Sequence, residues 1–430
     1  MKLRRIFCVL MAVILCCASL VGTVSAEAQK TGIKAPTNKL VSNGNGGKTD
    51  VGIWFMTYNN QRMFGANFGS GYPIRYRTLM PDGTFGILDS SKVEHIDFML
   101  KQIADAKIDF ILYDLTNGGF TAEVPYGWSG IDENGKNKNW IIQNARLTCE
   151  RIAEWNKNND WKIRYAMAVG AYDEICGGVP MGMVVEAQAK AIYNEWYMDP
   201  VIGGDNYYQI DGKLFLEIHD WGKNVREIWE RYAGDRTYGD KFFVRHGMSG
   251  EKGTYGWYCA FGTSIVDEEV MLVNPGQRNA GSPTPHAARE NGKLYKTCWE
   301  SVLNNTLPRI VMISSFNDYN EQTAVWTADS SRCKGDVDEQ WRDAKGNLNP
   351  SMYWDMTKEG IRLVRTFNGE IKGEFKSQIF DLGDSAANVQ NKNNGNTIVI
   401  IMIAVTAGVV VIGGVVVVLI LTSKKRKGKK

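Results

Sequence analysis

The sequence lacks the short motifs that hold a nucleotide or a catalytic metal ion. Its 430 residues contain no Walker loop, no HExxH pair and no glycine-rich dinucleotide fingerprint. We therefore expect no metal or nucleotide cofactor, and the chemistry must be sought among ordinary side chains.

Cysteine is sparse as well. Three of the eight cysteines lie in the first 26 residues, and the other five are widely spaced: Cys149, Cys176, Cys259, Cys298 and Cys333. Because five is odd and no two have the spacing of metal ligands, at least one is expected to be unpaired or to pair with another molecule. We assign these cysteines no metal-binding or catalytic role.

The chain also lacks a strong excess of positive charge outside its two ends. Its formal net charge is +3, and setting aside three cations near the start and six at the end leaves −6 for the rest. Such a surface gives no reason to expect nucleic acid as a partner.

Residues 1–26 have the pattern of a secretory signal peptide. Lys2, Arg4 and Arg5 precede an apolar stretch, and small residues at 24–26 form a cleavage site. We expect this segment to be removed and the following domain to be extracellular.

Residues 397–421, from Thr397 to Leu421, contain no charge and are followed by a basic tail at 422–430. At about 1.5 Å per residue this run is long enough to cross a bilayer as one helix, and the tail should stay in the cytoplasm. No LPxTG sorting motif precedes the run and no GxxxG pair lies in it. We predict a single-pass cell-membrane protein that acts as a monomer.

Two polar segments flank the central part of the chain. Residues 27–49 and 374–396 are rich in Asn, Lys and Gly and have too few apolar residues to form a core. The first is expected to be a linker and the second a stalk that holds residues 50–373 away from the membrane.

Residues 50–373 alternate between short apolar runs and amphipathic segments. Eight runs are typical of buried strands: 51–57, 110–113, 163–169, 214–218, 242–245, 256–259, 270–273 and 310–315. Helices are expected from 91, and over 140–155, 184–197, 225–232, 294–304 and 357–367. This order predicts an α/β fold, a (β/α)₈ TIM barrel.

Polar residues follow these strands where a barrel places its active site. They are Asp114, Asn117, His219, Asp220 and His246, and, after the last strand, Asn317, Asp318 and Glu321. Singly, each is more often a cap or a satisfied polar group than a catalyst. If the barrel closes, all of them converge on one mouth.

Asp318 and Glu321 stand three residues apart after the strand at 310–315. Two carboxyl groups held on one side of a turn can divide acid and base roles, as in glycoside cleavage. The alternative is a structural one, in which Asp318 caps a helix and Glu321 completes a capping box.

Three blocks resemble known glycoside hydrolases. The segment SFNDYNEQT at 315–323 resembles the S-F-N-E-W-x-E-G-T signature of glycoside hydrolase family 99 and the N-D-Y-G-E-S signature of family 71, the α-1,3-glucanases. The segment YYQIDGKLFLEIHD at 207–220 and the R-x-N-G-x-x-Y-x-x-x-W pattern at 289–299 are similar to segments of the same clan. The resemblance covers most of residues 50–373.

This resemblance implies roles for the two acids. Glu321 matches the acid/base of family 99, and Asp318 matches the carboxylate that assists the sugar 2-hydroxyl in attacking C1. Asp318 replaces a longer glutamate, which shifts the expectation toward family 71 and inverting cleavage. Gln322 and Tyr319 stand where family 99 usually has Gly and Trp. The expected substrate is an α-mannan or an α-glucan, as oligosaccharide or polysaccharide.

Aromatic side chains at predicted loops and strand ends favour a sugar substrate. Tyr58, Trp257 and Trp326 belong to this set, and sugar rings stack on such platforms. Tyr319, which lies between the two acids in the sequence, is also expected to bind substrate. About half of these aromatics are expected to pack loops instead. Two other functions remain open: a surface glycan-binding barrel without turnover, and a glycan-processing transferase of the same superfamily.

Overall fold

The structure is a computed structural model that describes residues 49–60, 74–116, 140–170, 179–219, 225–247, 253–256, 264–279, 282–335, 338–343 and 345–367. The predicted signal peptide, stalk, membrane span and tail lie outside these ranges, as does the linker except for Thr49. Within the described ranges, every helix is too short or too polar to cross a bilayer.

The chain divides into two compact units. The second unit comprises Arg342–Asn347 and Asp381–Lys430, and its described part is a turn in which the Asp343 carboxylate accepts from the backbone N–H groups of Lys345 and Asn347. All that follows concerns the first unit, which comprises Met1–Trp341 and Leu348–Phe380.

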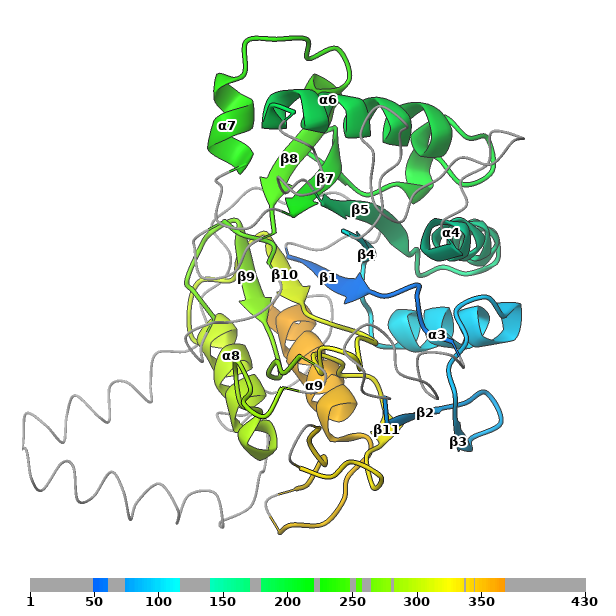
Figure 1. Ribbon diagram of the computed structural model, residues 1–430, viewed down its shortest axis with the longest axis vertical. Helices are drawn as coiled ribbons and strands as arrows, with labels where there is room; N and C mark the ends of the chain where they lie inside the picture. Colours follow the sequence, from blue (N-terminus) through cyan, green and yellow to red (C-terminus); the bar gives the residue numbers. More distant parts are fainter. Residues whose placement is uncertain are drawn as a thin grey trace, which may run out of the picture. The chain divides into compact units, whose positions relative to one another are not determined.

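A curled parallel sheet forms the centre of the first unit (Figure 1). Its parallel strands pair in the order β8 (Phe242–His246), β7 (Lys213–His219), β5 (Arg164–Gly170), β4 (Phe110–Leu115), β1 (Asp50–Phe55), β10 (Ile310–Ile313) and β9 (Val270–Val273). The short β6 (Gln209–Ile210) pairs antiparallel with β7. Most of the strand residues are buried, as expected for a parallel sheet covered by helices.

Helices lie between most successive parallel strands and cover the outside of the sheet (Figure 1). They are α3 (Val93–Asp105), α4 (Trp140–Asn158), α6 (Met181–Ile192), α7 (Val225–Arg231), α8 (Lys293–Leu303) and, after β10, α9 (Met352–Phe367). A π-turn at Tyr193–Tyr197 extends α6, and short 3₁₀ turns lie at Gly204–Asn206, Gly239–Lys241 and Glu290–Gly292. Each long helix buries one apolar face, because apolar residues recur every three or four positions.

Seven of the eight expected strands are present. The candidate at 256–259 is the exception: Gly256 belongs to no strand, and 257–259 fall outside the described residues. The described sheet therefore runs from β8 to β9 and fits a TIM-barrel-like domain. A second, antiparallel sheet of β2 (Arg77–Leu79), β3 (Phe85–Gly86) and β11 (Ala328–Asp329) was not expected.

Close packing fills the inside of the curled sheet. A Cβ atom at Gly52 on β1 would lie 2.3 Å from the Phe110 ring and 2.8 Å from the Met312 sulfur. Only glycine fits there, because both neighbours are large and fully buried. Phe110 in turn stacks on Tyr208 at 3.8 Å between ring centres.

The amino end of the sheet is closed by a buried ion pair. The Asp109 carboxylate, just before β4, accepts from Val51 N–H and from the Arg365 guanidinium on α9. Removing one partner of such a pair typically costs about 3–5 kcal/mol. This end therefore fixes α9 to the sheet and leaves the carboxyl end for chemistry.

Candidate active site

Ionisable side chains from four strand ends meet at the carboxyl edge of the sheet. Asp318 and Glu321 follow β10, Asp114 is on β4 and His219 ends β7; Tyr58 follows β1. Asp318 interacts electrostatically with Glu321 and Asp114, and His219 with Asp114 and Glu321. The structure thus brings together five of the residues that the sequence singled out.

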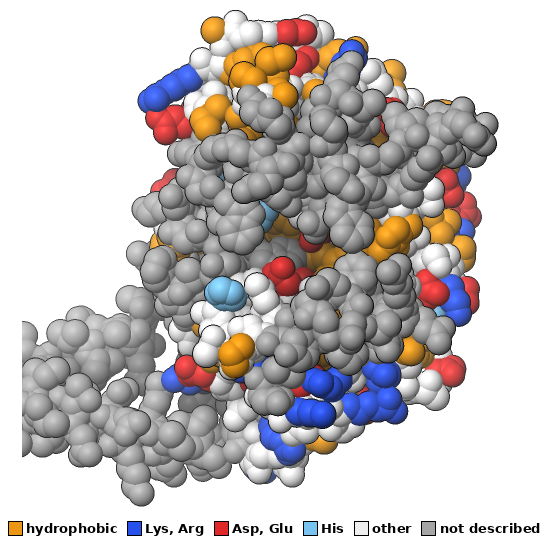
Figure 2. Space-filling model, viewed as in Figure 1, with side chains coloured by type: hydrophobic (Ala, Val, Ile, Leu, Met, Phe, Trp, Pro, Cys, Tyr) orange, Lys and Arg blue, Asp and Glu red, His pale blue; other side chains and the backbone are white. Residues whose placement is uncertain are grey.

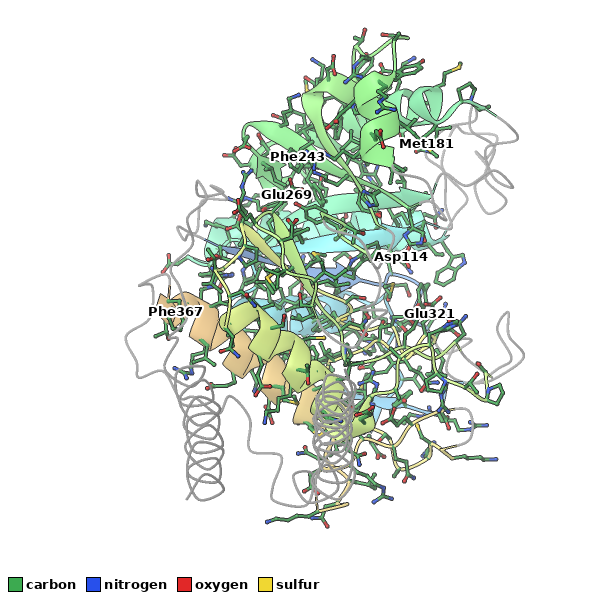
Figure 3. All side chains as sticks on the ribbon, turned by 90° about the vertical axis from the view of Figure 1, so that its left-hand side faces the viewer. Asp114, Met181, Phe243, Glu269, Glu321 and Phe367 are labelled. Atoms are coloured by element: carbon green, nitrogen blue, oxygen red, sulfur yellow. The ribbon has the colours of Figure 1, made fainter. Side chains whose placement is uncertain are left out.

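The figures agree with this arrangement. In Figure 3, Asp114 and Glu321 lie on the same side of the molecule, whereas Phe367 at the end of α9 lies on the opposite side. Figure 2 shows acidic and histidine side chains beside a hollow near the middle of the visible face.

A closed turn after β10 carries the two acids. Ser315 N–H donates to Thr323 O at 3.0 Å and Val325 N–H to Ser315 O at 2.9 Å, so the chain returns on itself. The hydroxyls of Ser315 and Thr323 lie 2.8 Å apart and also hydrogen-bond. Backbone and side-chain bonds together hold residues 315–325 in one conformation.

Asp318 stabilises this turn from inside. Its Oδ1 accepts from the backbone N–H groups of Asn320 and Glu321, both at 2.9 Å. The Tyr58 hydroxyl also hydrogen-bonds the carboxyl group. The capping role that the sequence offered as an alternative is therefore present, in a turn and not in a helix.

The environment of Asp318 opposes its ionisation. Its side chain is buried, with 1% of the residue exposed. Burial and the nearby carboxylates Glu321 and Asp114 raise the pKa of Asp318 to about 8, against the opposite effect of the bonds from Tyr58 and the backbone. Asp318 is thus suited to exchange a proton near neutral pH.

Glu321 has different surroundings. Its residue is half-buried, and its Oε2 accepts from Gln277 Nε2 at 2.7 Å. Its backbone carbonyl accepts from Arg278 N–H at 3.0 Å. Both contacts come from the segment after β9, so a second strand end positions this carboxylate.

Asp114 forms a local turn at the end of β4. Its Oδ1 accepts from Thr116 N–H at 3.0 Å and from the Thr116 hydroxyl at 2.6 Å. These bonds orient its carboxylate toward the shared edge.

Sequence reasoning missed Glu217, which lies in the middle of β7 and is fully buried. Its Oε1 is 3.8 Å from His219 Nδ1. Burial raises the pKa of Glu217 to about 7, against the opposing effect of His219. A glutamate between Leu216 and Ile218 in a buried strand was the available signal, because ionisable residues are rarely fully buried without a role.

His219 responds to the same neighbours. Burial favours its neutral form, but Glu217, Asp114 and Glu321 together outweigh burial and raise the pKa of His219. Its ring also meets Trp54 edge-on at 6.5 Å. The acids around His219 therefore favour its positively charged form.

Three predicted substrate-binding residues are used for packing. Asn317 exchanges two bonds with the Met56 backbone, at 2.8 and 3.0 Å. The Tyr319 hydroxyl donates to Trp326 O, and the Trp326 ring stacks on Phe316 at 5.0 Å. All three are buried. In the structure they support the turn, and their contact with substrate remains a prediction.

The remaining predicted site residues divide into two groups. His246 is buried at the end of β8, and its backbone carbonyl accepts from Tyr255 N–H at 3.0 Å. Asn117, Asp220 and Trp257 lie outside the described residues.

The described residues offer no candidate metal site, and the described cysteines are buried. Within the described ranges, no group of three His, Cys, Asp or Glu side chains could hold a metal ion. Cys149, Cys298 and Cys333 are buried, and Cys176 and Cys259 lie outside those ranges.

Comparison with known proteins gave structural matches alone. No family model and no curated protein matches the chain. The solved structure of the GH99 endo-alpha-mannosidase from Bacteroides thetaiotaomicron is 15% identical with a TM-score of 0.47, over 74% of this chain and 98% of the other. Its complex with bis-tris-propane gives the same identity and TM-score, over 75% and 99%. A glycoside hydrolase-like protein is 13% identical with a TM-score of 0.41, over 78% and 99%.

Proposed function

We propose that the chain is a glycoside hydrolase that cleaves an α-linked glycan, an α-mannan or an α-glucan, with Glu321 and Asp318 as its catalytic pair. The complete (β/α)₈ barrel is part of this proposal. So are an extracellular location, export by residues 1–26 and anchoring in the cell membrane by residues 397–421.

One observation carries the proposal: two carboxyl groups on the same turn have contrasting surroundings. Asp318 is buried and its pKa is raised, whereas Glu321 is half-buried and accepts a hydrogen bond from an amide. Carboxyl groups in unlike environments can hold and release protons at different pH, which is what acid–base cleavage of a glycosidic bond requires.

The proposed roles are those that the resemblance to family 99 implies. Glu321 gives its proton to the oxygen of the leaving sugar, and in a retaining reaction it then takes a proton from the water that attacks the intermediate. Asp318 accepts the proton of the nucleophile, which is the sugar 2-hydroxyl in a retaining reaction and water in an inverting one. Asp114 and His219 are then close enough to bind hydroxyl groups of the same sugar.

The test is hydrolysis of α-mannan, α-1,3-glucan and α-1,4-glucan by the purified full-length protein. We expect turnover of at least one of them, and a fall in rate of about 10²-fold or more for Glu321→Gln, the size expected for losing general acid catalysis. Glu290→Gln, an exposed carboxylate paired with Lys293, is the matched control and should keep the wild-type rate.

Other outcomes would point elsewhere. If the wild type, Asp318→Asn and Glu321→Gln all bind these glycans equally well and none of them hydrolyses the glycans, the chain is a glycan-binding protein. Products that grow when an acceptor sugar is added indicate a transferase. For a hydrolase, the anomer of the first product, read by NMR, distinguishes retention from inversion.

A further inference from the structure

The segment between β9 and α8 holds the turn that carries the two acids. Asn274 Nδ2 donates to Ser314 O at 3.1 Å, at the start of the turn. Gln277 and Arg278 bond Glu321 in the middle. Arg289 Nη2 donates to Ala324 O at 2.8 Å, near the end of the turn. Among these contacts, the one from Gln277 reaches a carboxylate oxygen.

Gln277 is itself rigidly placed. Its backbone exchanges two hydrogen bonds with Ala287, at 2.8 and 3.1 Å. Gly276 before it has a φ of +136°, and a Cβ there would lie 2.6 Å from the Arg289 side chain. Gln277 is 5% exposed. The amide therefore meets Glu321 in a fixed orientation, with little freedom to swing away.

The neighbours of the Gln277 side-chain amide show which of its two ends is the nitrogen. Nε2 lies 2.7 Å from Glu321 Oε2 and 3.4 Å from Asn279 Oδ1, and a carboxylate oxygen can accept from an NH₂ group. An amide NH₂ group donates and does not accept. A proton on Glu321 Oε2 would break the hydrogen bond from Gln277. A proton on Glu321 Oε1 would leave that hydrogen bond intact.

We propose that Gln277 is a positioning residue that keeps Oε2 of Glu321 unprotonated, so that the catalytic proton moves to and from the substrate at Oε1. The proposal rests on the function proposed above. It also assigns Gln277 a share in the ionisation of Glu321, because a donor to the ionised form favours that form. Asp318 on its own turn, Tyr58 after β1 and His219 on β7 also interact electrostatically with Glu321.

The test is the pH dependence of kcat and KM for Gln277→Leu and Gln277→Glu in the full-length protein. Gln277→Leu removes the donor, so we expect kcat to fall about tenfold, KM to stay within about twofold and the alkaline limb to move up by about one pH unit. In Gln277→Glu two carboxyl groups share one proton, so the alkaline limb should move up by more than in Gln277→Leu. Gln102→Glu on α3 makes the same chemical change elsewhere and should leave the profile unaltered.

A readout that needs no activity separates this proposal from the proposed function. In protein labelled with ¹³C at glutamate carboxyl carbons, the Glu321 signal is assigned by its loss in Glu321→Gln. Its titration midpoint should rise by about one unit in Gln277→Leu. An unchanged midpoint overturns the role of Gln277 whether or not the protein hydrolyses glycans. A raised midpoint in a protein that hydrolyses no glycan supports the proposed role of Gln277 and contradicts the proposed hydrolase function.

Discussion

The carboxylate of Glu217 occupies the space that a side chain at position 247 would need. A Cβ atom on Gly247 would lie 1.4 Å from Glu217 Oε1 and 3.1 Å from His219 Nδ1. Gly247 follows β8 directly, and its N–H donates to Ile218 O at 3.3 Å. The glycine thus leaves room for a buried acid between β7 and β8.

Gly247→Ala should therefore displace Glu217 and destabilise the fold by about 1–3 kcal/mol, the usual cost of overpacking. Urea unfolding measures this change. In the double variant with Glu217→Ala the space is open, so the added methyl group should cost little. If the two single costs simply add, the overlap with Glu217 is not the cause.

Stability should decline with rising pH through ionisation of Glu217. Its pKa is raised from 4.5 to about 7 in the folded state, so the folded chain keeps a proton that the unfolded chain releases. The resulting stability is fully present below about pH 4.5 and is lost as the pH rises through about 7, a change of about 3 kcal/mol. Unfolding free energies at pH 5 and pH 8 should differ by more in the wild type than in Glu217→Gln, and equal differences would exclude this role.

Tyr58→Phe should shift the pH profile of activity. The Tyr58 hydroxyl favours the ionised form of Asp318, so its loss should raise the pKa of Asp318 further. If Asp318 acts as a base, the acidic limb of kcat moves up by about one unit and kcat falls about tenfold at neutral pH. Tyr207→Phe is the control, because it removes a buried bond to Phe215 O away from the acids and should lower stability alone. A wild-type profile for Tyr58→Phe would exclude Asp318 as the base.

Arg289→Lys should loosen the turn that carries Glu321. Arg289 is buried, and its guanidinium donates to Gln322 O and Ala324 O from two directions that a lysine cannot match. We expect a loss of about 1.5–3 kcal/mol in unfolding free energy and a lower kcat. Arg362→Lys, at a half-buried pair with Glu359 on α9, should change stability by less than about 1 kcal/mol. Similar losses in both variants would contradict the special role of Arg289.

The backbone at Gln322 explains why Arg289 matters. Gln322 has a φ of +56°, in the left-handed region where family 99 usually places glycine. A side chain in that conformation costs about 1–2 kcal/mol. Bonds from Arg289 to Gln322 O, and from Glu339 N–H to Gln322 Oε1, hold the residue there. The replacement of glycine was visible in the sequence, whereas the bonds that offset it were not.

The order of strands and helices could be read from the sequence because local patterns set it. Ile310–Ile313 is a short apolar run, and apolar residues repeat through Trp140–Asn158 with helical spacing. The helix expected at 357–367 begins earlier, at Met352, because Tyr353 and Trp354 are also buried, against Tyr295 and Phe316. The small sheet of β2, β3 and β11 was missed because its strands are two or three residues long.

The sequence by itself determined the parallel α/β class, the carboxyl pair at 318 and 321, and the convergence of Asp114 and His219 with it, because strand ends in such folds share one edge. Only the tertiary structure decided which polar and aromatic residues face that edge. Asn317, Tyr319 and Trp326 turned inward to pack the turn, while Glu217 and Gln277 joined the acids. The physical reason is that burial and pairing across distant strands depend on neighbours that no local pattern specifies.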